Sequence, residues 1–361
     1  MIPVTKPFLP AREEFEDLVD RIWDRNWLTN DGPLVNELEL ELKRYLDLNH
    51  LLFVSNGTIA LQFAINVLEL EGDVITTPFS YVATTSSIVW EDCTPVFADI
   101  DPETLNIDPE KVDAAITPNT SAILATHCFG NPCDIEALRR IADANDLKII
   151  YDAAHCFGTT YQGECIFRYG DVSTASFHAT KLYHTVEGGA VITEDPDLLE
   201  RMAYMRNFGH DGPGQFNGVG INGKNSEMHA AMGLCNLGYI DEILERRAEQ
   251  CGYYDELLDN LHVERPEPLD GSDVNHAYYP VLFESHEAMK ASKEALEKRE
   301  ISPRRYFHPP LSSLEYVPEM DMPISEDVAD RILCLPLYHN LTREEQEMIA
   351  RLLLRTQRYE L

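Results

Sequence analysis

Short runs of apolar, largely β-branched residues alternate with turns and helical stretches from residue 51 to about residue 200. The helical stretches at 59–70 and 134–145 lie between such runs. This order of strand, turn and helix predicts βαβ units and therefore an α/β fold with a mostly parallel sheet flanked by helices. Five runs are interpreted as buried strands: 51–54, 74–77, 95–99, 121–126 and 147–151.

Polar residues just after these strands are candidates for a site, because open α/β sheets bind ligands at the carboxyl ends of their strands. Asp152 follows the run 147–151, and Lys181 stands among Ser, Phe, His, Ala and Thr shortly before the pair Gly188 and Gly189. One interpretation is a Schiff base between Lys181 and pyridoxal phosphate, with Asp152 against the pyridinium nitrogen. The alternative is a strand-end aspartate and an ordinary surface lysine.

Two turns near the amino-terminal side carry further candidates. After the run 51–54, Gly57 and Thr58 open a helix, where free N–H groups and the positive dipole end suit a phosphate. An ordinary helix cap is the alternative there. After 74–77, an aromatic side chain at Phe79 or Tyr81 could stack on a pyridine ring, unless it belongs to the core.

The stretch from Gly218 to Gly223 fits the pattern G-x-G-x-x-G, so a nicotinamide oxidoreductase has to be considered. The pattern follows a loop rich in Gly and Asp instead of a strand, and this context argues against a dinucleotide site.

From about residue 241 a long charged helix, through residue 261, marks the crossing into a smaller domain. The prediction is a large domain at 1–245 and a small C-terminal α+β domain at 246–361. Within the latter, Arg304 and Arg305 stand beside aromatic residues, which favours an anionic ligand such as a nucleotide diphosphate. A solvated basic patch is the alternative.

The composition excludes several classes of partner. The 361 residues carry 62 acidic and 29 basic side chains, a formal net charge of −33. Such a surface repels nucleic acid and anionic membranes, so neither is expected as a partner. The eight cysteines are scattered without a C-x-x-C pair, which predicts reduced, mostly buried thiols and no metal site. No signal core or long apolar run is present, so we expect a soluble cytoplasmic protein.

Four motifs in order resemble the DegT/DnrJ-type sugar aminotransferases, which are fold-type I enzymes that use pyridoxal phosphate. The similarity extends from Trp27-Leu28-Thr29 to Leu335-Pro336-Leu337 and thus spans nearly the whole chain. The motifs are Ser55-Asn56-Gly57-Thr58, Asp152-Ala-Ala-His155, Ser176-Phe-His-Ala-Thr-Lys181 and Glu187-Gly-Gly189.

The resemblance implies roles for individual residues. Lys181 would hold the cofactor and shuttle the proton, Asp152 would keep the ring nitrogen protonated, and His155 would lie against the ring or its hydroxyl. The remaining assignments are Gly57, Thr58 and Ser176 for the phosphate, Tyr81 for stacking, Asn222 and Lys224 for the neighbouring subunit's site, and Thr29, Arg305, Tyr306 and His308 for the substrate. Lys224 stands where the family has arginine, so a fork-like phosphate contact is not expected from it.

The implied reaction moves an amino group from glutamate through the pyridoxamine form of the cofactor to a keto-sugar nucleotide. The acceptor is expected to be a 4-keto-6-deoxysugar, giving an amino sugar for cell-surface or secondary glycans. The alternatives are a 3-keto sugar aminotransferase, a sugar dehydratase and a non-catalytic regulator. Lys181 argues against the dehydratase branch, where histidine replaces it. The resemblance also implies a homodimer with shared active sites.

Overall fold

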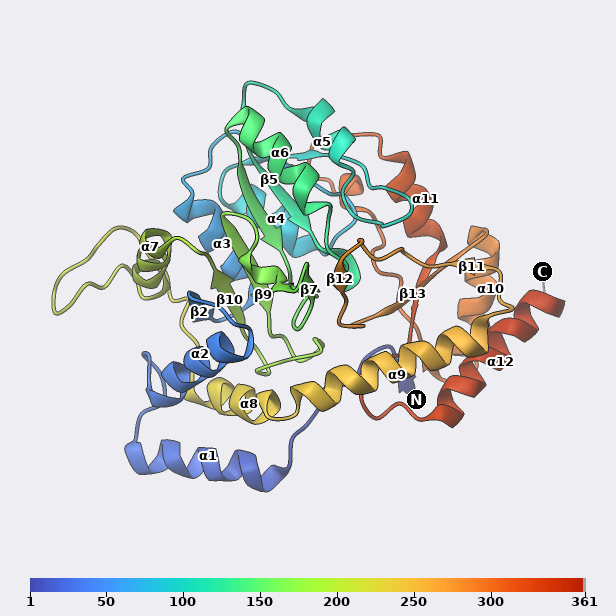
Figure 1. Ribbon diagram of the computed structural model, residues 1–361, viewed down its shortest axis with the longest axis horizontal. Helices are drawn as coiled ribbons and strands as arrows, with labels where there is room; N and C mark the ends of the chain where they lie inside the picture. Colours follow the sequence, from blue (N-terminus) through green and yellow to red (C-terminus); the bar gives the residue numbers. More distant parts are fainter. Residues whose placement is uncertain (360–361) are drawn as a thin grey trace.

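The computed structural model describes residues 1–359. Its centre is a seven-stranded sheet in the order β2-β10-β9-β6-β5-β3-β4 (Figure 1). Every strand runs parallel to the others except β10, which is antiparallel to both β2 and β9. The predicted, mostly parallel sheet is therefore confirmed. The strands are β2 (Leu51–Val54), β3 (Asp73–Thr76), β4 (Thr94–Phe97), β5 (Thr120–Thr126), β6 (Lys148–Asp152), β9 (Val172–Ser176) and β10 (Gly189–Ile192).

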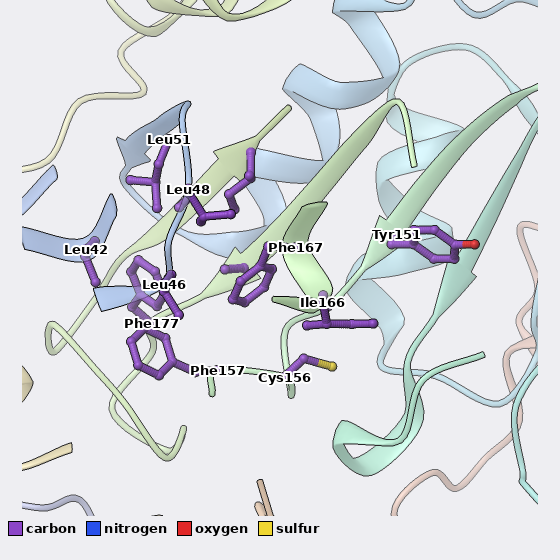
Figure 2. Packing of buried hydrophobic residues seen from close by; sticks show 14 of the residues in the cluster. Leu42, Leu46, Leu48, Leu51, Tyr151, Cys156, Phe157, Ile166, Phe167 and Phe177 are labelled. Carbon is purple, nitrogen blue, oxygen red and sulfur yellow. The ribbon is translucent and has the colours of Figure 1, made fainter. Parts of the chain in front are cut away.

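Helices cover both faces of this sheet, which explains why successive residues of its strands are buried instead of alternating between buried and exposed. Phe53 packs in the cluster that contains α2, α6 and α8, whereas its neighbours Leu52 and Val54 pack in the cluster that contains α3, α4 and α7. Figure 2 shows part of the first cluster, where Leu42 and Leu46 lie near Phe157 and Phe177. The helices are α1 (Arg12–Arg25), α2 (Pro33–Tyr45), α3 (Gly57–Val67), α4 (Val82–Trp90), α5 (Pro109–Ala115), α6 (Ile135–Asn145), α7 (Pro196–Arg206) and α8 (Glu227–Leu237).

The C-terminal part has its own core around an antiparallel sheet of β11 (Val263–Glu264), β13 (Tyr279–Phe283) and β15 (Ile332–Leu335). The first strand of the chain, β1 (Ile2–Pro3), pairs in parallel with β14 (Ile301–Ser302) and so joins this part. The proposed division after residue 245 falls inside α9. Glu360 and Leu361, the end of the predicted small domain, lie outside the described residues. The helices are α9 (Ile240–Leu258), α10 (His286–Glu297), α11 (Pro323–Arg331) and α12 (Arg343–Tyr359).

Shorter elements complete the structure. A small antiparallel sheet joins β7 (Thr160–Tyr161) to β8 (Glu164–Cys165) and β12 (Ser272–Asp273). Three single turns of 3-10 helix lie at Cys128–Gly130, Ile166–Arg168 and Leu311–Ser313. All eight cysteines are free thiols and all but Cys165 are buried. Among residues 1–359, no helix combines the length and the apolar character needed to cross a bilayer.

A loop separates α1 from α2, and a side chain from α8 fixes its geometry. Glu227 is buried, and its carboxylate accepts the N–H groups of Leu34 and Val35, each at 2.9 Å, at the start of α2. A Cβ atom on Gly32 would lie 2.5 Å from the Cδ atom of Glu227, so only glycine leaves room for this carboxylate. A residue far along the chain thus caps α2, where the helix dipole favours a negative charge.

Candidate active site

A cavity of about 730 Å³ lies at the carboxyl ends of the parallel strands. Its walls come from the segments that follow β2 and β3, from the ends of β5, β6 and β9, and from the C-terminal part of the chain. Parallel strands bring their carboxyl ends to one edge of a sheet, so residues distant in sequence converge there. The cavity is lined by eight of the predicted site residues: Gly57, Thr58, Tyr81, Asp152, His155, Ser176, Lys181 and Tyr306.

One end of the cavity is a close contact between the start of α3 and the end of β9. A Cβ atom on Gly57 would lie 2.9 Å from the Cβ atom of Ser176, so glycine is needed to bring the helix this near. The Asn56 side chain caps α3 by accepting the N–H of Ile59 at 2.9 Å. The N–H groups of a first helical turn have no acceptor within the helix, so Gly57 and Thr58 offer donors for an anion beside the Ser176 hydroxyl.

The glycine pair holds the same contact from the other side. A Cβ atom on Gly189 would lie 2.6 Å from the carbonyl carbon of Asn56 and 2.7 Å from the nitrogen of Gly57. Both atoms belong to the backbone, so neither can rotate away. The antiparallel strand β10 therefore passes directly behind the start of α3. The motif 187–189 needs glycine at its last position because a side chain there would collide with this helix start.

We expect Gly189→Ala to displace the start of α3 and to lower the affinity for a phosphate-bearing cofactor about tenfold or more, with a loss of about 1–3 kcal/mol in the free energy of unfolding. Thermal unfolding and a fluorescence titration with pyridoxal phosphate measure both quantities. Gly252→Ala in α9 is the matched control, because an added Cβ there meets nothing within 4 Å and alanine suits a helix. Equal cofactor affinity in the two variants would contradict this account.

Asp152 ends β6 and is buried. Its Oδ2 atom accepts the hydroxyl of Thr84 at 2.8 Å, and its Oδ1 atom accepts the N–H of Ala154 at 3.2 Å. Burial raises the pKa of this carboxyl group, whereas both hydrogen bonds and the charge of Lys181 lower the pKa. Two donors thus orient a carboxylate toward a cavity in which a cationic ligand group would stabilise its charge.

Lys181 lies in the connection between β9 and β10 and reaches the same cavity. Its backbone N–H donates to the carbonyl of His178 at 2.8 Å, so a tight turn positions it. Burial lowers the pKa of Lys181 to about 8, although the charge of Asp152 opposes this shift. A desolvated lysine with a lowered pKa is the kind of amine that acts as a nucleophile and as a proton carrier near neutral pH.

The rate at which the protein without cofactor binds pyridoxal phosphate covalently is expected to rise with pH. Only the neutral amine attacks an aldehyde, and a pKa of about 8 makes the neutral fraction about one tenth at pH 7 and about nine tenths at pH 9. Stopped-flow measurement of the visible band of the lysine-bound cofactor between pH 6.5 and pH 10 tests this. A rate still rising steeply above about pH 9.5 would show an ordinary lysine pKa.

His155 lies within a buried aromatic cluster. Its ring is parallel to that of Phe307 at 5.8 Å between centroids and meets Tyr278 edge-on at 4.8 Å. The Nδ1 atom accepts the N–H of Phe129 at 3.3 Å, which leaves the proton on Nε2. Burial, and secondarily the charge of Lys181, holds the pKa of His155 well below its usual value. His155 is therefore a neutral ring that can pack against a ligand and donate one hydrogen bond.

Several residues that contribute to the site carry no sequence motif. Thr84, which orients Asp152, is three residues beyond Tyr81 on α4, and this helical spacing is the one signal that could have identified it. Tyr278 and Phe307 support His155. Arg304, which the sequence offered together with Arg305 for an anionic ligand, lines the cavity. These three come from the C-terminal part, so only the tertiary structure brings them to the strand ends.

Five predicted site residues do not line this cavity: Thr29, Asn222, Lys224, Arg305 and His308. Lys224 donates to the Oδ1 atom of Asn222 at 2.8 Å, and its ammonium lies over the ring of Phe208 at 4.9 Å. Both residues belong to the segment 207–226, part of which extends from the body of the molecule after α7 (Figure 1). Lys224 and Asn222 thus form a pair at the base of a projecting loop.

The profile of the DegT/DnrJ/EryC1/StrS aminotransferase family matches residues 10–354. A dTDP-4-amino-4,6-dideoxy-D-glucose transaminase of Shigella dysenteriae is 40% identical over 354 residues, which cover 96% of each chain. A GDP-perosamine synthase of Escherichia coli O157:H7 is 31% identical over 363 residues, which cover 95% of each chain.

A solved structure shows the same architecture. The crystal structure of DesI in the presence of its TDP-sugar product matches this chain with a TM-score of 0.94 at 35% identity, and the match covers 99% of this chain and 93% of that chain. The predicted fold, a large sheet domain with a smaller C-terminal part, is confirmed by this likeness.

Proposed function

The chain belongs to the DegT/DnrJ/EryC1/StrS aminotransferase family, whose members depend on pyridoxal phosphate, and from this premise we propose that it aminates a nucleotide-linked sugar. The amino donor is glutamate. The acceptor is the C4 ketone of a dTDP-linked 4-keto-6-deoxysugar. This choice is supported by the 40% identity to a dTDP-4-amino-4,6-dideoxy-D-glucose transaminase.

The residues of the cavity fit the cofactor from end to end. Gly57, Thr58 and Ser176 would hold the phosphate, and the cradle there exists only because glycine stands at 57 and 189. Asp152 would pair with the ring nitrogen, and Tyr81, whose side chain is 61% exposed, is free to cover the ring. When bound, pyridoxal phosphate supplies an electron sink for the bond changes at the amino carbon.

Side chains of the protein would transfer the proton and supply the negative charge beside the ring. Lys181 would hold the cofactor through its Nζ atom, and the same atom, once free, would accept a proton and give it back. Its lowered pKa, about 8, lets one amine both accept and give that proton near neutral pH. Thr84 and the Ala154 N–H keep Asp152 oriented, so its charge is in place before the ring acquires one.

One observation carries this proposal: a desolvated lysine and a buried, doubly hydrogen-bonded aspartate line one cavity with a glycine-built anion cradle. An oxidoreductase or a passive binding protein needs no such amine. Pairing of Asp152 with a ring nitrogen also gives the carboxylate a reason to be buried.

The test supplies purified protein with pyridoxal phosphate, glutamate and a panel of 3-keto and 4-keto sugar nucleotides carrying dTDP, GDP or UDP. We expect the aminated dTDP-4-keto-6-deoxysugar as the preferred product, identified by mass spectrometry, with NMR placing nitrogen at C4. Release of 2-oxoglutarate in equal amount checks the donor. Nitrogen at C3, or no aminated sugar from any member of the panel, would refute the assignment.

The active sites, we propose further, are completed by a second copy of the chain. Asn222 and Lys224 do not line their own cavity, and exposed apolar side chains lie on the same segment and on the loop before α2. Contiguous exposed apolar surface favours association. These side chains are Trp27, Leu28, Phe208, Phe216, Val219 and Ile221.

Mixing two inactive variants tests the shared site. One variant carries Lys181→Ala, and the other carries Asn222→Ala with Lys224→Ala. In a mixed dimer one site has both Lys181 and the neighbour's pair intact, so random exchange should restore about a quarter of wild-type activity. Light scattering should give twice the mass of 41.0 kDa. If the two variants exchange subunits and no activity is restored, Asn222 and Lys224 do not contribute to the neighbour's site.

A further inference from the structure

Two consecutive arginines, Arg304 and Arg305, have opposite environments. An antiparallel bridge fixes the backbone of Arg304, whose N–H donates to the carbonyl of Cys334 at 3.1 Å and whose carbonyl accepts the N–H of Cys334 at 2.7 Å. In extended backbone, neighbouring side chains point to opposite sides. Arg304 accordingly lines the cavity, and Arg305 does not.

Arg305 is occupied by groups of α11. One guanidinium nitrogen donates to the carbonyl of Ala329 at 2.8 Å and to the carboxylate of Asp330 at 3.0 Å, and the side chain is 18% exposed. His308 also faces Asp330, with 4.0 Å between its Nδ1 atom and the carboxylate. Two of the four residues that the sequence assigned to the substrate, Arg305 and His308, thus lie beside an acidic side chain of the protein itself.

Arg304 has a different set of neighbours. Its side chain is exposed, and among residues 1–359 no carboxylate lies within 4 Å of its guanidinium. The acidic residues that share the cavity wall already have partners: Asp152 accepts Thr84 and Ala154, and Glu187 lies 3.6 Å from the Nε2 atom of His178. Arg304 is also the only arginine among the described residues that line this cavity.

We propose that Arg304, and not Arg305, is the specificity-determining residue that binds the oxyanion of a substrate in this cavity. The inference rests on the proposed function and adds the residue that recognises the charged part of the substrate. A guanidinium forms paired hydrogen bonds with two oxygens of a carboxylate or a phosphate, which a lysine cannot reproduce.

Two substrate groups share this chemistry. The donor glutamate carries carboxylates and the sugar nucleotide carries a diphosphate, and both substrates use the same cavity in turn. The bridge to Cys334 fixes the backbone of Arg304, and Tyr306 and Phe307 line the same cavity. Separate measurement of the two half-reactions identifies which oxyanion Arg304 binds.

The experiment compares Arg304→Gln, Arg304→Lys and the adjacent control Arg305→Gln as cofactor-loaded proteins. Single-turnover spectra give the half-saturating concentration of glutamate in one half-reaction and of the sugar nucleotide in the other. We expect Arg304→Gln to raise one of the two about 10- to 100-fold, with a smaller rise for Arg304→Lys. Arg305→Gln should leave both within about twofold and lower the melting temperature instead.

Binding without turnover separates this inference from the proposed function. Calorimetric titration with dTDP alone and with glutarate alone should show affinity for at least one of them in the wild type and its loss in Arg304→Gln. That result supports an oxyanion site even if no sugar nucleotide is aminated. Unchanged half-saturation and unchanged binding in Arg304→Gln would overturn the inference, as would a loss confined to Arg305→Gln.

Discussion

Replacement of Lys181 by alanine is expected to abolish the visible band of the lysine-bound cofactor and to lower the rate of transamination by about 10⁴-fold or more. The reason is that one amine has two tasks, holding the cofactor and carrying the proton, and no other lysine lines the cavity among the described residues. Absorbance spectra and a coupled assay for 2-oxoglutarate measure the two effects.

Lys148→Ala is the matched control for this variant. Lys148 begins β6 at the opposite edge of the sheet, half-exposed and 3.8 Å from Asp171. Its removal should leave the spectrum and the rate unchanged. Lys181→Ala should keep the wild-type melting temperature of the unloaded protein within a few degrees, because among residues 1–359 no carboxylate lies within 4 Å of its ammonium group. A normal cofactor band in Lys181→Ala would remove the basis of the mechanism.

Asp152→Asn should be the second most damaging change, with a loss of about 10²- to 10⁴-fold in kcat and with the cofactor still bound. The amide oxygen can accept the N–H of Ala154 while the amide nitrogen donates to the hydroxyl of Thr84, so both contacts persist while the negative charge is lost. Without that charge, the protonated ring nitrogen and hence the electron sink are no longer stabilised.

The same substitution has a predicted effect on Lys181. The charge of Asp152 raises the pKa of Lys181, so its removal should lower that pKa further below about 8 and shift the pH profile of cofactor loading to lower pH. A structural defect alone would not shift this profile. Asp171→Asn is the control. The carboxylate of Asp171 also accepts a backbone N–H, that of Ile149 at 2.8 Å, but Asp171 lies at the amino end of β9, away from the cavity. A wild-type kcat in Asp152→Asn would contradict the assigned role.

From the sequence alone, five of the seven strands of the sheet could be predicted, all but β9 and β10, together with several residues at the strand ends. Buried strands are recognisable as short apolar runs, and the polar residue after each run is local information. Asp152 and the helix start at Gly57 could be predicted in this way. The parallel order of the strands places them at one edge with Ser176, which only the family motif indicated. Lys181 was identified by its motif, since its connection is not itself a strand.

Only the tertiary structure decided which residues of the C-terminal part reach the site. The pair Arg304 and Arg305 is chemically symmetrical in the sequence, and the bridge to Cys334 determines which of them faces the cavity. The register of a strand pair depends on both segments, and a shift by one residue would turn Arg305 toward the cavity and Arg304 away from it. For the same reason the support of His155 by Phe307 and the capping of α2 by Glu227 could not be predicted. Local patterns specify an element and its apolar face, whereas contacts between distant segments depend on how those elements pack.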